Sequence, residues 1–448
     1  MSAPEPSAPG PISVVDLFSG CGGFTQGFHE FRPVGDPDAG PVFHSVAAVE
    51  HDRAAAATYA VNFGSGRMDK DFPAARVHFG DIEDWHPTPE ACDADVVVGG
   101  PPCQGFSALN RNKKGVERNR LWEEYVRIVA EIGPKVFVIE NVDRFLKSDE
   151  FRNLLAEVQV GGKLENYLLV DPPGRGSTEE NPNRYLLNSA NYGAVQARRR
   201  AIVIGVRKDV ANGRAMSYPT PTHVRGPRRA GGAPAQPLDG LDAAGPPRWK
   251  AVDSVFKESQ DLKIQGTELP DDKEHIAELN GVIAGAFTTE QLHFGRNPEL
   301  LSQARYKVIR PGGNRKDLRG KWYTVTESGE IKTFDTDTPT GVKTPVKYLS
   351  TESWDNHNTG SGDVMGRLRL GEPSVTIRTE FFKPEKGRYL HPDDPRPITH
   401  YEAARIQGFP RGFRWCGSKT EIARQIGNAV PIPLGTAIAS AIHVFLRG

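Results

Sequence analysis

Short apolar runs alternate with helix-like stretches along the first half of the chain. The runs cover residues 12–18, 42–49, 76–79, 95–98, 136–139 and 201–206. Between them, residues 52–63 and 121–132 place apolar side chains at helical spacing. Strands that are apolar along their whole length and alternate with helices indicate an α/β fold with a parallel sheet covered on both faces. Such sheets bind ligands beyond the carboxyl ends of their strands, so we expect functional residues directly after each run.

The pattern changes after residue 207. Residues 208–250 are rich in Pro, Gly, Ala and Arg, and residues 250–395 are turn-rich, with short strand candidates at 322–325 and 374–377. Helical spacing returns at 399–407 and 433–446. We therefore predict a flexible tail at 1–11, a first part of the α/β domain at 12–207, an insertion at 208–395 and a C-terminal part at 396–448 that packs back onto the first.

Composition narrows the class of protein. The chain has 448 residues, of which 38% are hydrophobic and 25% charged, as in soluble globular proteins. It has no apolar run long enough to span a membrane and no secretory signal pattern. Its four cysteines are too widely spaced for a disulfide framework or a zinc site, which favours a reducing cytoplasmic compartment. The 56 basic and 56 acidic residues exclude a uniformly basic surface but allow local basic ones.

The first candidate site is a glycine-rich turn after the first strand, in the segment DLFSGCGGFTQGF at 16–28. Glycine lets the backbone pass close to a ligand, although an ordinary tight turn explains such a loop equally well. The spacing also does not match the dinucleotide fingerprint G-x-G-x-x-G. Glu50 and Asp81 follow the next two strands, where a carboxylate can accept ribose hydroxyls or an exocyclic amine. Together these features indicate an adenosine-containing cofactor.

The second candidate site is Cys103, in the segment DVVVGGPPCQGFS. Pro101 and Pro102 stiffen the backbone before it, so that the thiol is held in place at the end of a buried strand. Cysteine is more often a small buried hydrophobic residue. The residues around Cys103 favour a reactive thiol instead.

Charged residues beside two further strands complete the set: one follows its strand and two precede theirs. Glu140 ends the apolar run VFVI, where a carboxyl group can donate a proton or cap the following helix. Arg198 and Arg200 precede the run AIVIGV. Alternate residues on a strand face the same side, so both guanidinium groups should point to one place. A solvated surface cluster is the alternative.

These segments, in this order, resemble the C5-cytosine DNA methyltransferases, and specifically those of bacterial restriction-modification systems. The resemblance covers residues 12–434 and is carried by DLFSGCGGF, Glu50, Gly80-Asp81-Ile82, GGPPCQGFS, Glu140-Asn141-Val142, QARRR, RPITHYEAARIQGFP and RQIGNAVP. It implies a Rossmann-like S-adenosylmethionine-dependent methyltransferase domain with a mixed, mostly parallel sheet. It also implies a smaller, irregular target-recognition domain, with double-stranded DNA held between the two domains.

The resemblance also implies a mechanism. The Cys103 thiolate would attack C6 of a cytosine flipped out of the duplex, which activates C5 to accept the methyl group of S-adenosylmethionine. Glu140 would share a proton with N3 of the ring, while Arg200, with Arg198, would hold O2 and anchor Glu140 or a phosphate. The base that then removes the C5 proton is unassigned. The products are 5-methylcytosine and S-adenosylhomocysteine, and no metal is implied.

The family's cofactor residues carry over onto both ends of this chain. The matching positions are Phe18, Ser19, Gly20, Cys21, Gly22, Gly23, Glu50, His51, Asp81, Ile82, Pro102, Leu121, Asn428 and Val430. Among them Glu50 would bind the ribose, and Asp81 the adenine amine.

DNA contacts are expected from the basic segment 104–121, interpreted as a loop that closes over the DNA backbone, or else as a solvated charged loop. Its candidate residues are Gln104, Ser107, Arg111, Lys113 and Lys114. The basic stretch 296–321 is a second, weaker candidate for phosphate contacts.

The expected partners are duplex DNA and a cognate restriction endonuclease or other defence proteins. We expect a monomer in the bacterial cytoplasm, associated with the nucleoid and not with a membrane. A non-catalytic DNA-binding relative and an RNA methyltransferase are the alternatives. The recognition sequence, and base contacts by insertion residues such as Asn356, Asn358 or Arg367, cannot be assigned from the sequence.

Overall fold

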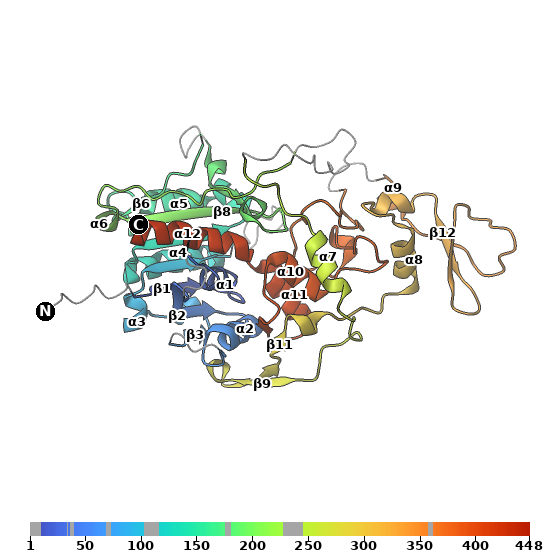
Figure 1. Ribbon diagram of the computed structural model, residues 1–448, viewed down its shortest axis with the longest axis horizontal. Coiled ribbons are helices and arrows are strands. Elements are labelled where there is room, and N and C mark those ends of the chain that lie inside the picture. Colours follow the sequence, from blue (N-terminus) through green and yellow to red (C-terminus); the bar gives the residue numbers. More distant parts are fainter. Residues whose placement is uncertain are drawn as a thin grey trace.

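The computed structural model describes residues 10–33, 35, 40–68, 73–102, 116–174, 181–226, 245–356 and 362–448, with the backbone alone at 116–120. Most of the predicted tail therefore lies outside the described residues. Figure 1 shows three regions along the long axis: a sheet with its helices, a helical region around α10 and α11, and an outer region around α8 and β12.

The first region is built on a mixed, mostly parallel sheet, as predicted. Among the described residues eight strands pair in the order β3-β2-β1-β4-β5-β8-β6, with β7 also paired to β8. Strands β1 to β5 run parallel, and β8 is antiparallel to β5, β6 and β7. The bounds are β1 Ile12–Leu17, β2 Phe43–Glu50, β3 Arg76–Phe79, β4 Val96–Gly99, β5 Val136–Asn141, β6 Tyr167–Leu169, β7 Leu186–Asn188 and β8 Arg199–Arg207.

The strand order fixes where a ligand can bind. The chain moves outward from β1 to β2 and β3, and then returns to the other side of β1 with β4 and β5. Leu17 and Gly99, at the carboxyl ends of β1 and β4, lie opposite each other in the ladder. The loops that follow these two strands therefore leave the sheet side by side at its topological switch point.

Helices cover this sheet, and one of them comes from the far end of the chain. The predicted helix at 433–446 is confirmed as α12, Ile432–Arg447. Its apolar stripe buries Leu434, Ile438 and Ile442 completely. It packs so closely on α1 that a Cβ atom on Gly27 would lie 2.9 Å from the Cα of Gly435. The helices of this region are α1 Gly23–His29, α2 Arg53–Phe63, α3 Pro89–Cys92, α4 Val116–Ile132, α5 Asp149–Glu157, α6 Lys208–Ala211 and α12.

The helical region has a core of its own. Trp415 and Tyr401 are fully buried there, together with Tyr59 of α2. The C-terminal part of the chain therefore contributes to two cores: α10 and α11 lie here, whereas α12 packs on the sheet. The elements are α7 Asp253–Gln260, β9 Lys273–Ile276, β10 Gly281–Ala284, β11 Phe287–Thr288, α10 His400–Gln407, β15 Arg414–Trp415 and α11 Lys419–Asn428.

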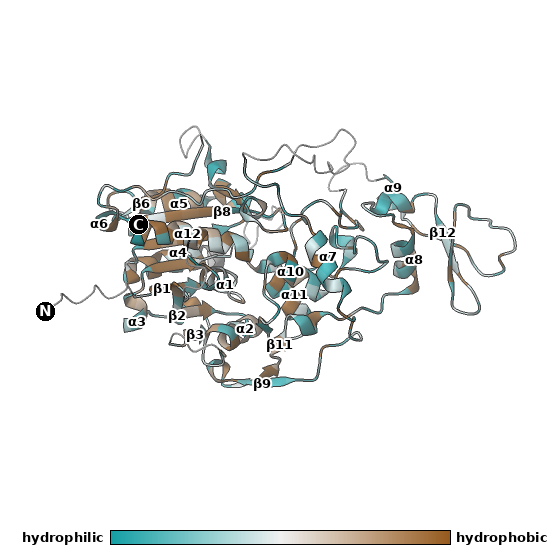
Figure 2. Cartoon of the chain, viewed as in Figure 1, coloured by the Kyte–Doolittle hydropathy of each residue, from teal (hydrophilic) through white to brown (hydrophobic). Residues whose placement is uncertain are grey.

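The outer region has a smaller core, and hydrophilic residues are frequent along its helices and strands (Figure 2). The predicted strand at 322–325 is confirmed as β12, whereas residues 374–377 form no strand, only a single bridge from Ser374 to Gln196. The elements are α8 Leu300–Val308, β12 Trp322–Val325, β13 Ile331–Phe334, β14 Lys347–Tyr348 and α9 Glu352–Asn356.

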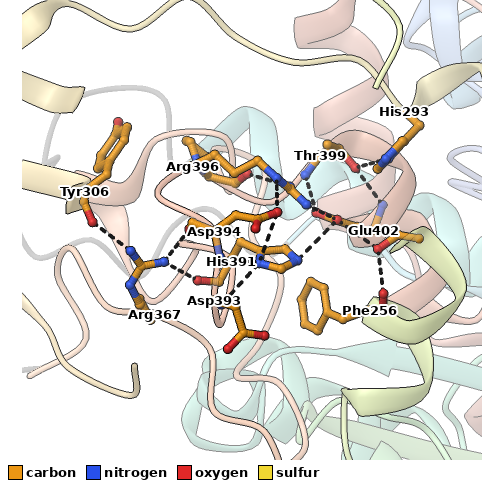
Figure 3. Close-up of polar contacts among 12 residues, drawn as sticks. Phe256, His293, Tyr306, Arg367, His391, Asp393, Asp394, Arg396, Thr399 and Glu402 are labelled. Carbon is orange, nitrogen blue, oxygen red and sulfur yellow. Dashed lines mark hydrogen bonds and ion pairs between the residues drawn. The ribbon is translucent and has the colours of Figure 1, made fainter. Parts of the chain in front are cut away.

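A buried network of charged groups joins the helical and outer regions (Figure 3). Glu402, at the N-terminus of α10, is fully buried and accepts two hydrogen bonds from Arg396, at 2.8 and 2.9 Å. Burial alone would raise the pKa of Glu402, but the hydrogen bonds and charge of Arg396, with His391 nearby, hold this pKa below its usual value. The network therefore stabilises an ionised carboxylate between the two regions.

Arg367 belongs to the same junction. It is buried, and its guanidinium donates to the backbone carbonyls of Tyr306, Ile309 and His391, each at 2.7 Å, and to that of Asp394. A side chain whose donors are used in this way holds backbone segments together. Arg367 is therefore not available to read a base.

Among the described residues, no single helix has the length and apolar character needed to cross a membrane. The bent pair α11 and α12 meets those two criteria, and only those.

Candidate active site

A cleft of about 1390 Å³ opens at the carboxyl ends of β1, β2, β4 and β5. Its walls come from the loops that follow these strands, from the start of β8, from residues 376–379 and from the end of α11. Almost every candidate residue that the structure describes lines this cleft. Gly22 is the one exception, because it lies beneath the loop against α2.

The glycine-rich turn is tightly wound. Phe18 has a φ of 54°, a conformation that is uncommon for a residue other than glycine, and Gly22 has a φ of 88°. A Cβ atom on Gly22 would lie 2.4 Å from the ring of Phe63, and one on Gly23 would lie 2.9 Å from the carbonyl of Val430. These two glycines therefore let α2 and the C-terminal segment close onto the turn. This packing role was not predicted from the sequence.

Glu50 holds the turn from the neighbouring strand. Its two carboxylate oxygens accept hydrogen bonds from the backbone N–H groups of Gly20, at 2.8 Å, and Asp52, at 2.7 Å. Burial raises the pKa of Glu50, and these two hydrogen bonds oppose the rise. Each oxygen of a carboxylate can accept more than one hydrogen bond, so Glu50 can also accept from a pair of vicinal hydroxyls.

Further polar groups in the wall suit a nucleoside. The Asp81 carboxylate accepts the N–H of Glu83 and stands beside buried Ile82, while His51 is exposed at the rim. The Oγ of Ser19 and the Oε1 of Gln425 are buried, and no described group forms a hydrogen bond to either atom. Buried polar atoms usually have partners, so these two atoms fit a polar ligand in the cleft.

Sequence reasoning did not single out four of the wall residues. Gln425 lies within the block RQIGNAVP, and Asp16 within DLFSGCGGF, but neither was singled out. Asp16 is buried beneath the turn, accepts a hydrogen bond from Thr25 at 2.8 Å and has its pKa raised well above the usual value by burial. Asp52 and Arg424 form an ion pair of 3.0 Å across the rim. No periodicity marks any of these contacts.

Glu140 and Arg200 form an ion pair in the wall of the cleft. Arg200 Nε lies 2.7 Å from Glu140 Oε1, and the two side chains are only 13% and 12% exposed. Glu140 is the last residue but one of β5 and Arg200 is the second residue of β8, and the antiparallel pairing of these strands brings the two residues together. The alternative of a solvated charge cluster does not fit this burial.

Arg198 lines the same cleft but makes different contacts. It is 2% exposed and donates to the carbonyl of Ile377 at 2.8 Å and, at 3.5 Å, to that of Asn428. Burial lowers the pKa of its guanidinium well below the usual value, and the charge of Arg200 acts in the same direction. Arg198 therefore ties residues 377 and 428 to the start of β8, whereas Arg200 reaches Glu140.

The backbone that leads to Cys103 is held at this wall. Asn141 donates from Nδ2 to the carbonyl of Pro101 at 2.9 Å. A Cβ atom on Gly100 would lie 3.1 Å from Glu140 Oε2, so the strand end passes directly beside that carboxylate. Cys103 itself, and the predicted DNA-binding residues Gln104, Ser107, Arg111, Lys113 and Lys114, lie outside the described residues.

The arrangement can bind a nucleoside cofactor next to a carboxyl group that an ion pair holds in position. In the described part of the chain, Cys21, Cys92 and Cys416 are free thiols. No group of three or more His, Cys, Asp or Glu residues there could hold a metal ion.

The sheet order, the tight turn and the cleft define an α/β protein with a ligand-sized cleft at the switch point of a mostly parallel sheet. Residues 12–444 match the family model described as C-5 cytosine-specific DNA methylase, and the chain belongs to this family. It is thus a DNA (cytosine-5)-methyltransferase, as the resemblance predicted, and the family implies S-adenosylmethionine as methyl donor and duplex DNA as substrate.

Similar proteins are found in bacteria and animals. The chain is 27% identical over 466 residues to the Type II methyltransferase M.AgeI of Thalassovita gelatinovora, covering 97% of this chain and 99% of that protein. It is 26% identical over 488 residues to mouse DNA (cytosine-5)-methyltransferase 1, covering 97% of this chain but 28% of the mouse protein.

A solved structure shows the same fold. The protein, from Escherichia coli, is described as a DNA modification methyltransferase encoded within a prophage. It aligns with a TM-score of 0.52 and 22% identity, covering 98% of this chain and 100% of that one.

Proposed function

We propose that this protein methylates C5 of a cytosine flipped out of a specific duplex DNA sequence, through a covalent bond between Cys103 and C6. The observation that supports the proposal best is the shared cleft. It brings the Glu140–Arg200 ion pair, the glycine-rich turn and the Pro101–Pro102 segment together, and Cys103 follows that segment directly.

S-adenosylmethionine fits the described residues. Glu50 has lone pairs left for the two ribose hydroxyls, and Asp81 offers an acceptor for the adenine amine. Ser19 Oγ lacks a described partner and would gain one from the methionine part of the cofactor. When bound, the cofactor supplies an electrophilic methyl group carried on a sulfonium.

The protein's own groups prepare the cytosine. The Cys103 thiolate adds to C6, the electron pair of the C5–C6 bond moves toward C5, and a proton shared between Glu140 and N3 offsets the charge that develops on the ring. Arg200 fixes the Glu140 carboxylate through its ion pair. After C5 has been methylated, loss of the C5 proton to a base restores the double bond and expels the thiolate.

Arg198 has a positioning role in this scheme. Its contacts hold the carbonyls of residues 377 and 428, which both line the cleft, so it positions these two segments and does not bind the ring. The other residues that resemble the family's cofactor contacts, from Phe18 to Val430, are proposed to line the bound cofactor.

Because several similar proteins are named Type II methyltransferases, we extend the proposal to the biological setting. The protein would act as a monomer on bacterial DNA in the cytoplasm. Its methylation would protect sites that a cognate endonuclease cleaves.

Transfer of a tritiated methyl group from S-adenosylmethionine tests the proposal. We expect label on duplex DNA and none on transfer RNA, no label with Cys103→Ala, and full activity with Cys92→Ala, because Cys92 is an exposed thiol away from the cleft. Bisulfite sequencing of the labelled DNA gives the target sequence. Label on RNA alone, or full activity of Cys103→Ala, would contradict the proposal.

A further inference from the structure

A second cavity, of about 1540 Å³, lies beside the cleft. The two share three lining residues: Ala197, Thr376 and Arg378. Ala197 belongs to the QARRR block and is joined to Ser374 by a backbone hydrogen bond of 2.8 Å. The second cavity therefore opens directly beside the wall that holds Glu140 and Arg200.

The lining of this cavity is cationic. It contains twice as many Arg and Lys side chains as Asp and Glu side chains. Two of those from the outer region form ion pairs: Arg310 with Asp317 at 3.1 Å, and Arg388 with Asp363 at 3.0 Å. A polyanion would have to compete with these carboxylates.

Two other arginines of the lining come from a different part of the chain. Residues 222–226 and 245–250, which we call the strap, lie between β8 and α7 and carry Arg225 and Arg248. Arg225 is exposed and Arg248 is half-buried. No ion pair joins either arginine to a carboxylate within the described part of the chain. Their guanidinium groups are therefore available to an anion.

The strap is fixed to the first region, which contains the sheet. Trp249 donates from its indole N–H to Asn191 Oδ1 at 2.8 Å, and the Asn191 carbonyl accepts the backbone N–H groups of Thr222 and His223. A bridge between Val224 and Arg248 joins the two segments. Asn191 lies only a few residues before the QARRR block, so the strap has a defined place relative to Arg198 and Arg200.

Both arginine side chains rest on parts of the strap. The Arg225 guanidinium lies 5.4 Å from the centre of the Trp249 ring, a cation–π distance that orients the group and leaves its N–H donors free. The stem of Arg248 packs on Gly226, where a Cβ atom would come within 3.3 Å of it. Fixed guanidinium groups of this kind lose little freedom when they bind a phosphate.

We propose that the strap is a DNA-backbone-binding surface, on which Arg225 and Arg248 contact phosphates of the duplex that carries the target cytosine. The inference rests on the proposed function and adds to it a DNA contact from outside both the basic segment 104–121 and the outer region. Because the two cavities are adjacent, phosphates held at the strap keep the duplex in a position from which one nucleotide can rotate into the cleft.

The test compares Arg225→Gln/Arg248→Gln with the wild type in binding a duplex that contains the target site, over a series of salt concentrations. Each lost phosphate contact should reduce the slope of log K against log salt by about 0.9, so the double variant should lose about 1.8, with affinity roughly 30-fold weaker near physiological salt. The KM for DNA should rise, whereas kcat at saturating DNA and the affinity for S-adenosylmethionine should not change.

Two further variants serve as controls. Arg214→Gln removes an arginine that lies 5.3 Å over the ring of Phe445 and does not line the cavity, and it should keep the wild-type slope. Arg225→Lys/Arg248→Lys keeps both charges and should keep most of the slope, which separates lost charge from misfolding.

An unchanged slope in the glutamine double variant, or an equal loss in Arg214→Gln, would overturn the inference, as would a loss of RNA binding with DNA binding intact. A wild-type protein that produces no 5-methylcytosine in any duplex would instead refute the proposed function.

Discussion

The two cavities of this protein are nearly equal in size and adjacent, but their linings differ in charge. The cleft at the strand ends has more acidic than cationic side chains, together with glycine-loop backbone, whereas the neighbouring cavity has twice as many cationic as acidic side chains. A cationic sulfonium nucleoside suits the first, and a phosphate backbone suits the second. On our proposals, the fold separates the two substrates by charge while keeping their sites adjacent.

The two cavities can also be distinguished by the effects of substitutions in each. Variants in the cleft should change chemistry or cofactor affinity and leave the salt dependence of DNA binding unchanged. Variants in the cationic cavity should do the opposite.

The largest expected effect comes from Glu140. Glu140→Gln removes the group that shares the proton with N3 and breaks the ion pair with Arg200. We expect kcat to fall about 10²–10⁴-fold, the range for loss of a general acid or base. DNA affinity should keep its wild-type salt slope. Single-turnover methyl transfer measures the first quantity, and a slope that changes would place Glu140 in DNA binding.

The next largest effect is expected at the junction between the helical and outer regions. Glu402→Gln leaves Arg396 without its buried carboxylate, which should lower the free energy of unfolding by about 3–5 kcal/mol. Because the folded pKa of Glu402 is lowered, its contribution is present above the unfolded pKa, about 4.3, and is lost as the pH falls through the folded pKa. Urea unfolding at neutral and acidic pH should therefore show a smaller acid sensitivity in the variant. Equal acid sensitivity in both proteins would show that Glu402 is not ionised in the fold.

Glu50 should have a smaller effect, confined to the cofactor. Glu50→Gln should weaken S-adenosylmethionine binding roughly 10–100-fold, as expected when a charged hydrogen-bond acceptor is lost. Since burial raises the pKa of Glu50, wild-type affinity should fall as the pH drops through that raised value, because the protonated form accepts fewer hydrogen bonds. Calorimetric titration across the acidic range measures this, and the variant should lack the trend. An identical trend in the variant would assign the titration to another group.

The smallest effect is expected at the rim. The Asp52–Arg424 ion pair is exposed, with side chains 34% and 50% accessible. Arg424→Gln should change stability by about 0–1 kcal/mol, the range for surface ion pairs. Thermal unfolding with and without cofactor checks this. A loss larger than that of Glu402→Gln would reverse the order of the two sites.

The sequence predicted the cleft well because its residues follow strands. The carboxyl ends of parallel strands meet at one edge of a sheet, so Gly20, Glu50 and Glu140 could be placed together from their positions alone. The antiparallel pairing of β8 with β5 then put Arg200 beside Glu140. The local sequence pattern was sufficient here because the geometry of a parallel sheet brings the ends of neighbouring strands together.

Contacts between distant segments could not be predicted in this way. Arg198 binds a carbonyl 179 positions away, and Trp249 is fixed by Asn191, yet neither contact has a periodic signature. Residues 374–377 have strand-like composition but are held by Gln196 and its neighbours instead of a ladder. The short strands β6 and β7 gave no apolar run that could be recognised.

The central claim is that Cys103 bonds to the target cytosine inside the acidic cleft. The most direct measurement is mass spectrometry of the protein after incubation with S-adenosylmethionine and a target duplex that carries 5-fluorocytosine, from which no C5 proton can be lost. The account predicts a protein–DNA adduct of one to one stoichiometry, with the modification on the peptide that contains Cys103. An adduct on Cys21, Cys92 or Cys416, or none from protein that methylates the normal duplex, would contradict it.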